Sequence, residues 1–250
     1  MQKKVIFSNN GKILSGILHI PVKLPAPAVV LCHGFTSSKV NKGAWADYLC
    51  KKGFIAFRFD FNGHGESYGN FLDFTITKCV SDLKSAVAFL KKQKFVKKIG
   101  ITGHSLGGQV LMIYAAKNKI DAVAPISAVF SLNDTWVMKN IDEWKKKGIR
   151  YFNVRGRDWS RRKKPLSYNF AIDRQKYDMK VLTKKIKCSV LIMHGDKDED
   201  IPLSHARMYY KNINVPKKLV VLKGTKHTIT RKKDLKILYE ETAKWFSKYL

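Results

Sequence analysis

One serine lies between glycines in a run whose residue types and spacing could support nucleophilic chemistry. The run Gly-His-Ser-Leu-Gly-Gly occupies positions 103–108, with Ser105 third, after a short segment of strand character at 98–102 and before an apolar segment with helical spacing. A sharp turn from strand to helix strains the residue at the turn, and flanking glycines let neighbouring chain approach closely. The helix N-terminus would direct N–H groups at the same place, where an oxyanion forms during acyl transfer. The sequence therefore predicts that Ser105 is a nucleophile for acyl transfer.

A second motif would complete an oxyanion-binding site next to this serine. The continuous apolar run at 28–32 is typical of a buried parallel strand, and it ends at His33-Gly34-Phe35. We expect the backbone N–H groups of Phe35 and Leu106 to be the two donors that face the developing negative charge. His33 is expected to support this loop by hydrogen bonding rather than to act on a substrate.

The remaining parts of a nucleophilic triad follow two further apolar runs. The run at 189–193 leads into a segment with three alternating acids, Asp196, Asp198 and Asp200, and the run at 218–222 is followed by His227. A serine hydroxyl is a weak nucleophile, so a base must accept its proton and an acid must orient that base. His227 is the predicted base, and one of the three aspartates is the predicted acid. The order serine, aspartate, histidine is that of α/β-hydrolases and differs from the orders in chymotrypsin-like and subtilisin-like enzymes.

Together with the run Asp-Phe-Asn-Gly-His-Gly-Glu-Ser at 60–67, these motifs extend over most of the chain. The chain resembles the α/β-hydrolase superfamily. Within it, the chain is similar to the branch of small carboxylesterases that includes cinnamoyl and feruloyl esterases, serine aminopeptidase S33-like hydrolases and monoacylglycerol lipases. In that branch the acid lies three residues after the glycine that ends its strand, which implies Asp198 here.

The resemblance implies a serine carboxylesterase that works through Ser105, His227 and Asp198 and an acyl-enzyme intermediate, with aryl or hydroxycinnamoyl esters among the candidate substrates. Acyl thioesters, acylglycerols and peptides are alternatives, because the same triad acts on them. No cofactor and no metal is expected. The alternating aspartates match the first half of a calcium-binding loop, but Ile201 and Arg207 occupy the positions that need glycine and glutamate.

Positioning these residues requires a sheet whose strands end at a common edge. Strands are predicted at 4–7, 14–20, 28–32, 55–59, 98–102, 122–126, 189–194 and 218–222. Helical spacing is found at 44–52, 80–92, 108–117, 204–212 and 233–249. This alternation predicts an α/β fold with a mostly parallel eight-stranded sheet and helices on both faces, formed by residues 1–129 and 176–250.

The segment 130–175 interrupts this alternation and is expected to be an inserted lid. It has poor strand and helix periodicity and many aromatic and basic residues. We expect Trp136 and Trp144 to line the substrate channel, the alternative being that the rings only form a small core within the lid. A basic cluster in the same segment would instead select anionic substrates. It consists of Arg155, Arg157, Arg161, Arg162, Lys163 and Lys164.

The charge and cysteine content limit the remaining choices. Lys and Arg number 48 against 19 Asp and Glu, a formal net charge of +29, but no nucleic-acid recognition motif accompanies this charge. We expect a small-molecule ester as partner and no specific nucleic acid, with a noncatalytic polyanion-binding protein on a hydrolase scaffold as the alternative.

Four cysteines without Cys-x-x-Cys spacing predict reduced thiols, and the apolar stretch near the N-terminus is too short for a signal peptide or membrane helix. These features predict a cytoplasmic location, and they leave open whether the chain forms a homodimer.

Overall fold

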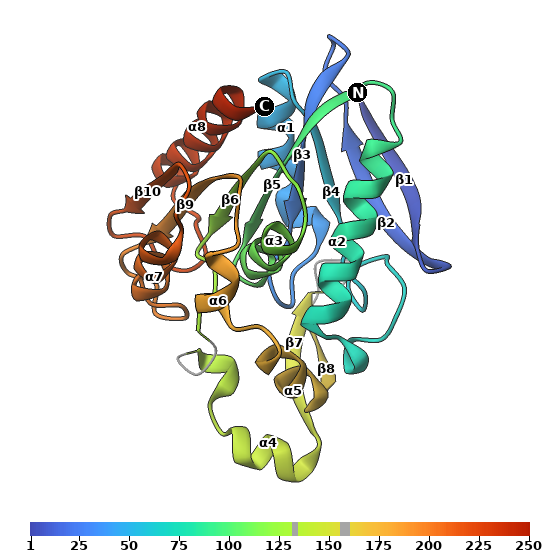
Figure 1. Cartoon of the computed structure of the whole chain (residues 1–250). Helices are drawn as coiled ribbons and strands as arrows, with labels where there is room; N and C mark the ends of the chain where they lie inside the picture. The colour runs from blue at the N-terminus through green and yellow to red at the C-terminus, as the bar shows by residue number, and fades with distance from the viewer. Residues whose placement is uncertain (132–134, 156–160) are drawn as a thin grey trace.

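An eight-stranded β-sheet forms the centre of the molecule in the computed structural model, which describes residues 1–131, 135–155 and 161–250 (Figure 1). The strand order is β1-β2-β4-β3-β5-β6-β9-β10, and neighbouring strands are parallel except that β2 runs antiparallel to both β1 and β4. The predicted α/β fold with a mostly parallel sheet is thereby confirmed. The strands of this sheet are β1 (Gln2–Asn9), β2 (Lys12–His19), β3 (Ala26–Cys32), β4 (Ile55–Phe59), β5 (Val96–His104), β6 (Ala122–Ile126), β9 (Ser189–Gly195) and β10 (Lys217–Leu222).

Helices cover both faces of the sheet, as expected. On one face α2 and α3 share a large apolar core with α6 and α7, and on the other α1 and α8 pack around residues such as Trp45 and Phe246 (Figure 1). Helix α3 is buried nearly all round because it contacts the sheet, α2 and α6. The helices are α1 (Gly43–Lys51), α2 (Ile76–Lys91), α3 (Leu106–Lys117), α6 (Met179–Thr183), α7 (Ser204–Asn212) and α8 (Lys232–Tyr249), with short 3-10 turns η1 (Lys39–Lys42) and η2 (Phe71–Asp73).

The burial pattern explains why the strands could be recognised in the sequence. β4, β6 and β9 are buried along their whole length, as strands covered on both faces must be, and each consists mainly of apolar residues. All the predicted strands and helices of the sheet region occur, with small shifts at their ends. Helix α2 begins earlier than predicted, at Ile76, because the side chain of Thr75 accepts a hydrogen bond from the Lys78 N–H and caps the helix.

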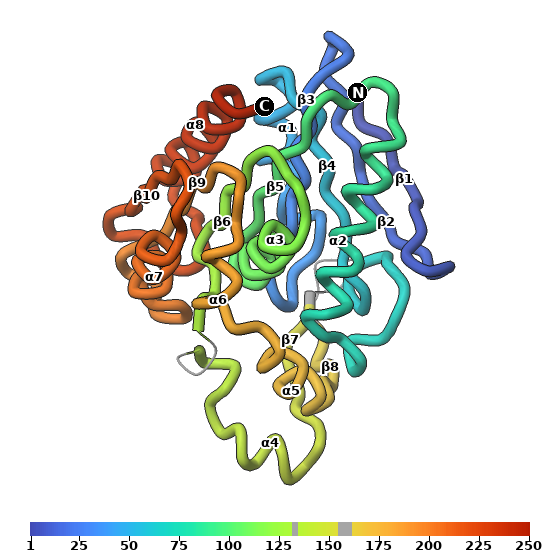
Figure 2. The backbone as a smooth tube through the Cα atoms, in the orientation of Figure 1, coloured from blue at the N-terminus to red at the C-terminus, as the bar shows by residue number. Residues whose placement is uncertain are grey.

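The described residues of the segment 130–175 lie between β6 and α6 and extend beyond the carboxyl ends of the parallel strands, in the lower part of Figure 2. This segment contains several short elements that its poor periodicity did not predict. Of these, β7 and β8 pair antiparallel as a separate two-stranded sheet. β8 has the sequence Arg-Arg-Lys-Lys-Pro-Leu-Ser, so its conformation comes from pairing rather than from strand propensity. The elements are η3 (Trp136–Met138), α4 (Ile141–Lys147), β7 (Ile149–Arg155), β8 (Arg161–Ser167) and α5 (Asn169–Gln175).

Both chain ends lie at the end of the molecule opposite this segment (Figure 2). Among the described helices, none has the length and apolar character needed to cross a membrane. Within the same described residues, no three His, Cys, Asp or Glu side chains gather closely enough to hold a metal ion. Of the six residues in the basic cluster expected from the sequence, Arg157 lies outside the described residues.

Candidate active site

Ser105 occupies a sharp turn between β5 and α3. Its backbone has φ 57° and ψ −118°, a conformation in the left-handed region that is strained for a residue with a side chain. Two residues later, a Cβ at Gly107 would lie 2.5 Å from the carbonyl oxygen of His33, so only glycine fits there. The close approach of α3 to the end of β3 therefore holds Ser105 at the carboxyl edge of the sheet, where the sequence placed it.

The three residues expected to form a triad meet at this edge. His227, in the loop after β10, places its Nε2 3.0 Å from the Oγ of Ser105 and its Nδ1 2.8 Å from the Oδ2 of Asp198. Ser105 and Asp198 are 9% and 6% exposed, and the side chain of His227 is 15% exposed. These contacts would let the ring accept the serine proton on one nitrogen while the carboxylate holds the other.

Asp198 is surrounded by hydrogen-bond donors. Its Oδ1 accepts from the N–H groups of Asp200 (3.1 Å) and Ile201 (2.8 Å). On the other side, the Nε2 of His194 lies 3.2 Å from Oδ2 and 2.8 Å from the Ile201 carbonyl oxygen, so this nitrogen carries the proton. Burial by itself raises the pKa of the Asp198 carboxyl, but the hydrogen bonds from His194 and His227 and the charge of His227 outweigh it and hold the pKa well below its usual range. Asp198 is therefore ionised at neutral pH.

The two loops that carry Asp198 and His227 are joined to each other. Asp196 accepts a hydrogen bond from the N–H of Gly224 (2.5 Å), and the N–H of Lys197 donates to the carbonyl oxygen of Thr225 (3.0 Å). A Cβ on Gly195 would clash with that same oxygen of Thr225, which makes glycine necessary at the end of β9. Asp196 thus has a structural partner of its own, and of the three alternating aspartates only Asp198 contacts His227.

His104 contributes a contact that the sequence did not indicate. Its Nε2 lies 2.8 Å from the backbone oxygen of His227, and the centres of the two rings are 4.7 Å apart. Burial holds the pKa of His104 well below its ordinary value, so the ring is neutral and its N–H donates to that oxygen. The residue before the serine thereby fixes the backbone that carries His227.

The loop after β3 has the hydrogen bonds expected for a supporting histidine. The backbone N–H of Phe61 donates to the Nε2 of His33 (3.1 Å), which leaves the proton on Nδ1 to donate to the Gly34 carbonyl oxygen (2.8 Å). Phe35 and Leu106 both line the cavity at Ser105. The N–H of Leu106 is at the first position of α3, where it has no acceptor within the helix.

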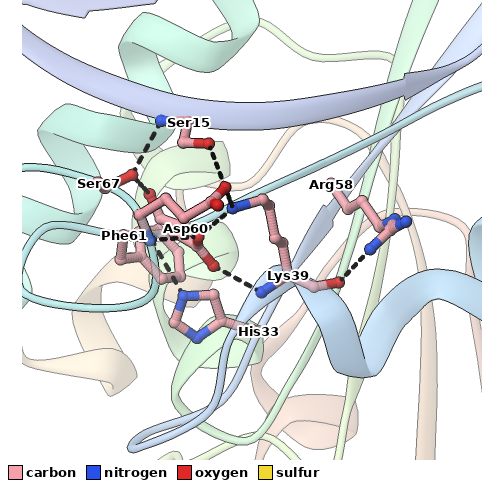
Figure 3. Close-up of polar contacts among 8 residues, drawn as sticks. Ser15, His33, Lys39, Arg58, Asp60, Phe61 and Ser67 are labelled. Carbon is pink, nitrogen blue, oxygen red and sulfur yellow. Dashed lines mark hydrogen bonds and ion pairs between the residues drawn. The ribbon is translucent and has the colours of Figure 1, made fainter. Parts of the chain in front are cut away.

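A buried charge network supports the chain next to this loop (Figure 3). Lys39, 3% exposed, forms an ion pair with Asp60 and a second with Glu66 (2.8 Å), and its backbone N–H donates to Asp60 (2.7 Å). Arg58 donates to the Lys39 carbonyl oxygen (3.0 Å), and Ser67 donates to the backbone oxygen of Asp60 (2.5 Å). The conspicuous 60–67 motif of the sequence therefore holds the chain just after the 33–35 loop and does not reach Ser105.

A cavity of about 500 Å³ opens at Ser105 and is shared by the sheet edge and the 130–175 segment. Trp136, 38% exposed, lines it and packs beside Phe35. Trp144 does not line it, which corrects the expectation for this residue. Its ring is 2% exposed and packs against Phe152 and Phe170 in the main apolar core, and its Nε1 donates to the Leu166 carbonyl oxygen (3.1 Å). Sequence reasoning also missed Arg174, a buried residue in the cavity wall.

Several known proteins are similar to this chain over most of its length. The chain is 24% identical to a thermostable monoacylglycerol lipase from Bacillus sp. (strain H-257), over 97% of this chain and 99% of that protein. It is 25% identical to the human mitochondrial palmitoyl-protein thioesterase ABHD10, over 95% of this chain and 78% of that protein. The solved structure of Est1E from Butyrivibrio proteoclasticus with bound ferulic acid superimposes with a TM-score of 0.80 at 26% identity, covering 98% of each chain.

A family match covers the part of the chain that carries the serine. Residues 24–169 match the family described as serine aminopeptidase, S33, which is more than half of the chain and includes the 33–35 loop, the 60–67 motif and the turn at Ser105. The relatives and the solved structure extend the similarity to the loops after β9 and β10. The chain therefore belongs to the serine aminopeptidase S33 family of α/β-hydrolases.

Proposed function

We propose that this protein is a serine carboxylesterase with Ser105 as nucleophile, His227 as general base and Asp198 as the acid that orients the base. The single observation that carries the proposal is the chain of contacts from Ser105 Oγ through both nitrogens of His227 to Asp198, at 3.0 Å and 2.8 Å. Contacts of this length are within reach for proton transfer. The strained backbone at Ser105 supports the same role, because strained residues cluster at active sites, where the surrounding structure holds them in place.

The first half of the reaction forms an acyl-enzyme. His227 Nε2 takes the proton of Ser105 as Oγ attacks the ester carbon, and Asp198 stabilises the imidazolium that results. The N–H groups of Phe35 and Leu106 bind the oxyanion of the tetrahedral intermediate, and each such donor typically contributes about 2.7–4 kcal/mol. The protonated ring then gives its proton to the alkoxide, which leaves as an alcohol.

The second half regenerates the enzyme. Water donates a proton to the neutral His227 and attacks the acyl carbon, and collapse of the second tetrahedral intermediate returns that proton to Ser105. The products are one alcohol and one carboxylic acid, and the chemistry uses only these side chains and backbone groups.

The same residues would act on several acyl groups, so the substrate class is a separate part of the proposal. An ester is favoured because the Bacillus relative is named as a monoacylglycerol lipase and Est1E binds ferulic acid. A thioester is the second candidate, since human ABHD10 is named as a palmitoyl-protein thioesterase. We further propose that residues 130–175 form a lid, because Trp136, Val137 and Asn153 of this segment line the cavity at Ser105.

One experiment tests the proposed function directly. The wild-type protein and Ser105→Ala are assayed on 4-nitrophenyl esters and the matching acyl-coenzyme A thioesters, and both are treated with a fluorophosphonate probe. We expect activity and labelling at Ser105 in the wild type, and a loss of activity on the order of 10⁴-fold or more in the variant. Labelling at another serine would refute the assignment. Activity on thioesters alone would replace the ester by the second candidate.

A further inference from the structure

A buried arginine forms part of the wall of the cavity at Ser105. Arg174 is 3% exposed and lies near the end of α5, with its guanidinium carbon 5.5 Å from the centre of the Phe170 ring. Its Nε has no hydrogen-bond partner among the described residues. Leaving a buried charged donor without an acceptor is unfavourable, and a native structure that retains one calls for an explanation.

The helix that carries Arg174 is tied firmly to the core. The carboxylate of the preceding residue, Asp173, accepts hydrogen bonds from the N–H (2.8 Å) and the Oγ1 (2.6 Å) of Thr77 on α2. Phe170 packs against Phe35 and Phe74, with ring centres 5.5 Å and 5.6 Å apart. Adjacent residues of α5 therefore have different roles: Asp173 anchors the helix, and Arg174 is held as a fixed part of the cavity wall.

The guanidinium keeps its charge without an acid to balance it. Burial lowers the pKa of Arg174 to about 9, which is still above neutral pH, so the group is protonated. No ion pair links it to an acid within the described part of the chain. The other titratable or charged side chains of the cavity wall are Lys42, Asp200, His104, His227 and Tyr239, so the wall holds two basic side chains, Lys42 and Arg174.

We propose that Arg174 binds a carboxylate carried by the substrate, so that the preferred substrates are esters with a free acid group, such as half-esters of dicarboxylic acids. This inference rests on the proposed function of Ser105. The planar guanidinium presents parallel N–H donors that match the two oxygens of a carboxylate. The neighbouring wall is apolar, with Val129, Trp136 and Phe170, which suits a single negative charge at the end of an apolar chain.

A specific contact of this kind differs from the general attraction of a basic protein for anions. The net charge of +29 attracts any anion, and salt screens that attraction over a distance of about 10 Å at 0.1 M. A buried guanidinium is screened much less. Preference for an acidic ester that survives high salt therefore points to Arg174 rather than to the exposed lysines.

The experiment compares matched pairs of esters in several variants. One pair is mono-4-nitrophenyl adipate against 4-nitrophenyl hexanoate, and the other places the acid on the alcohol side, as 4-carboxyphenyl hexanoate against 4-carbamoylphenyl hexanoate. The ratio of kcat/KM for the acidic and the neutral ester is measured for the wild type, Arg174→Met, Arg174→Lys and Lys176→Met, at 0.05 M and 0.5 M NaCl. Lys176→Met is the matched control, because Lys176 lies close in sequence with its side chain 64% exposed.

We expect the wild type to prefer the acidic member of at least one pair at both salt concentrations. Arg174→Met should lower that ratio by about 10- to 100-fold, Arg174→Lys by less, and Lys176→Met should leave it unchanged. Calorimetry with monoethyl adipate in Ser105→Ala should show binding that disappears when Arg174→Met is added. The thermal midpoint of Arg174→Met should equal or exceed that of the wild type, since a buried charge without a partner is removed.

Three outcomes would overturn the inference. They are the absence of any preference in a wild type that hydrolyses neutral esters through Ser105, an equal fall of the ratio in Lys176→Met, and a lower thermal midpoint of Arg174→Met with an unchanged ratio, which would make the arginine structural. Inactivity of the wild type on all four esters would instead contradict the proposed function, so the two failures are distinguishable.

Discussion

The Nε2 of His104 lies 2.8 Å from the backbone oxygen of His227, so the residue before the turn serine holds the loop that carries its partner. His104→Phe keeps the ring and removes the donor. We expect kcat to fall by about 3- to 10-fold with little change in KM, because a net hydrogen bond contributes about 0.5–1.5 kcal/mol and this one positions the base rather than the substrate. Steady-state kinetics on a neutral 4-nitrophenyl ester measures both. A rise in KM at constant kcat would show that His104 serves substrate binding instead.

The three aspartates after β9 should differ sharply in their effect on activity. Asp198→Asn should lower kcat by on the order of 10⁴-fold, as loss of the orienting carboxylate does in a comparable triad. Asp196→Asn and Asp200→Asn are the matched controls and should cost less than about tenfold: an asparagine at 196 can still accept from the Gly224 N–H, and Asp200 reaches Asp198 through its backbone. A severe loss in Asp196→Asn with a mild one in Asp198→Asn would contradict the assignment of the acid.

Two buried histidines should make the protein sensitive to mild acid. Burial lowers the pKa of both His33 and His64 to about 3, whereas in the unfolded chain each takes up a proton near its ordinary value of 6.5. The stability that they contribute is therefore complete above pH 6.5 and is lost as the pH falls from 6.5 toward 3, by about 1.4 kcal/mol per pH unit for each histidine. Urea unfolding followed by tryptophan fluorescence between pH 8 and pH 5 measures the total slope, to which His19 and His104 add because burial also lowers their pKa values.

His64→Phe is the variant that isolates one of these protons. The ring of His64 packs against Phe71 and Phe74, with ring centres 5.2 Å and 4.8 Å away, so phenylalanine preserves the packing and removes the titrating group. The slope below pH 6.5 should shrink by about one proton. An unchanged slope would mean that His64 is protonated in the folded state.

Trp136 and Trp144 should respond in opposite ways to truncation. Trp136→Ala should alter the preference among acyl groups with little loss of stability, because its partly exposed ring lines the cavity. Trp144→Ala should destabilise the protein by about 3–5 kcal/mol, because it leaves a cavity where the buried ring packs in the apolar core. A panel of 4-nitrophenyl esters of increasing chain length and urea unfolding give the two readouts. Equal changes in selectivity would contradict the placement of Trp144.

The sequence was sufficient for the sheet because its central strands are largely apolar, and for the meeting of Ser105, Asp198 and His227 because each lies within a few residues of the end of a strand. Contacts between loops carried no comparable signal. His104 contacts the loop after β10, His194 contacts the loop that follows its own strand, and Arg174 lies in a segment whose elements are too short to show a period. The position of Trp144 was mispredicted for a related reason: aromatic content indicates that rings pack, but the sequence does not say against what.

The three residues at the site are brought together over long distances along the chain. His227 contacts Ser105 across 122 positions and Asp198 across 29, and it follows β10, the strand at one edge of the sheet. With His227 as the proposed base, we expect turnover to return during refolding only after β10 has docked, since neither β5 with α3 nor β9 carries His227. The delay between the recovery of fluorescence and the recovery of turnover therefore measures how late β10 joins the edge of the sheet.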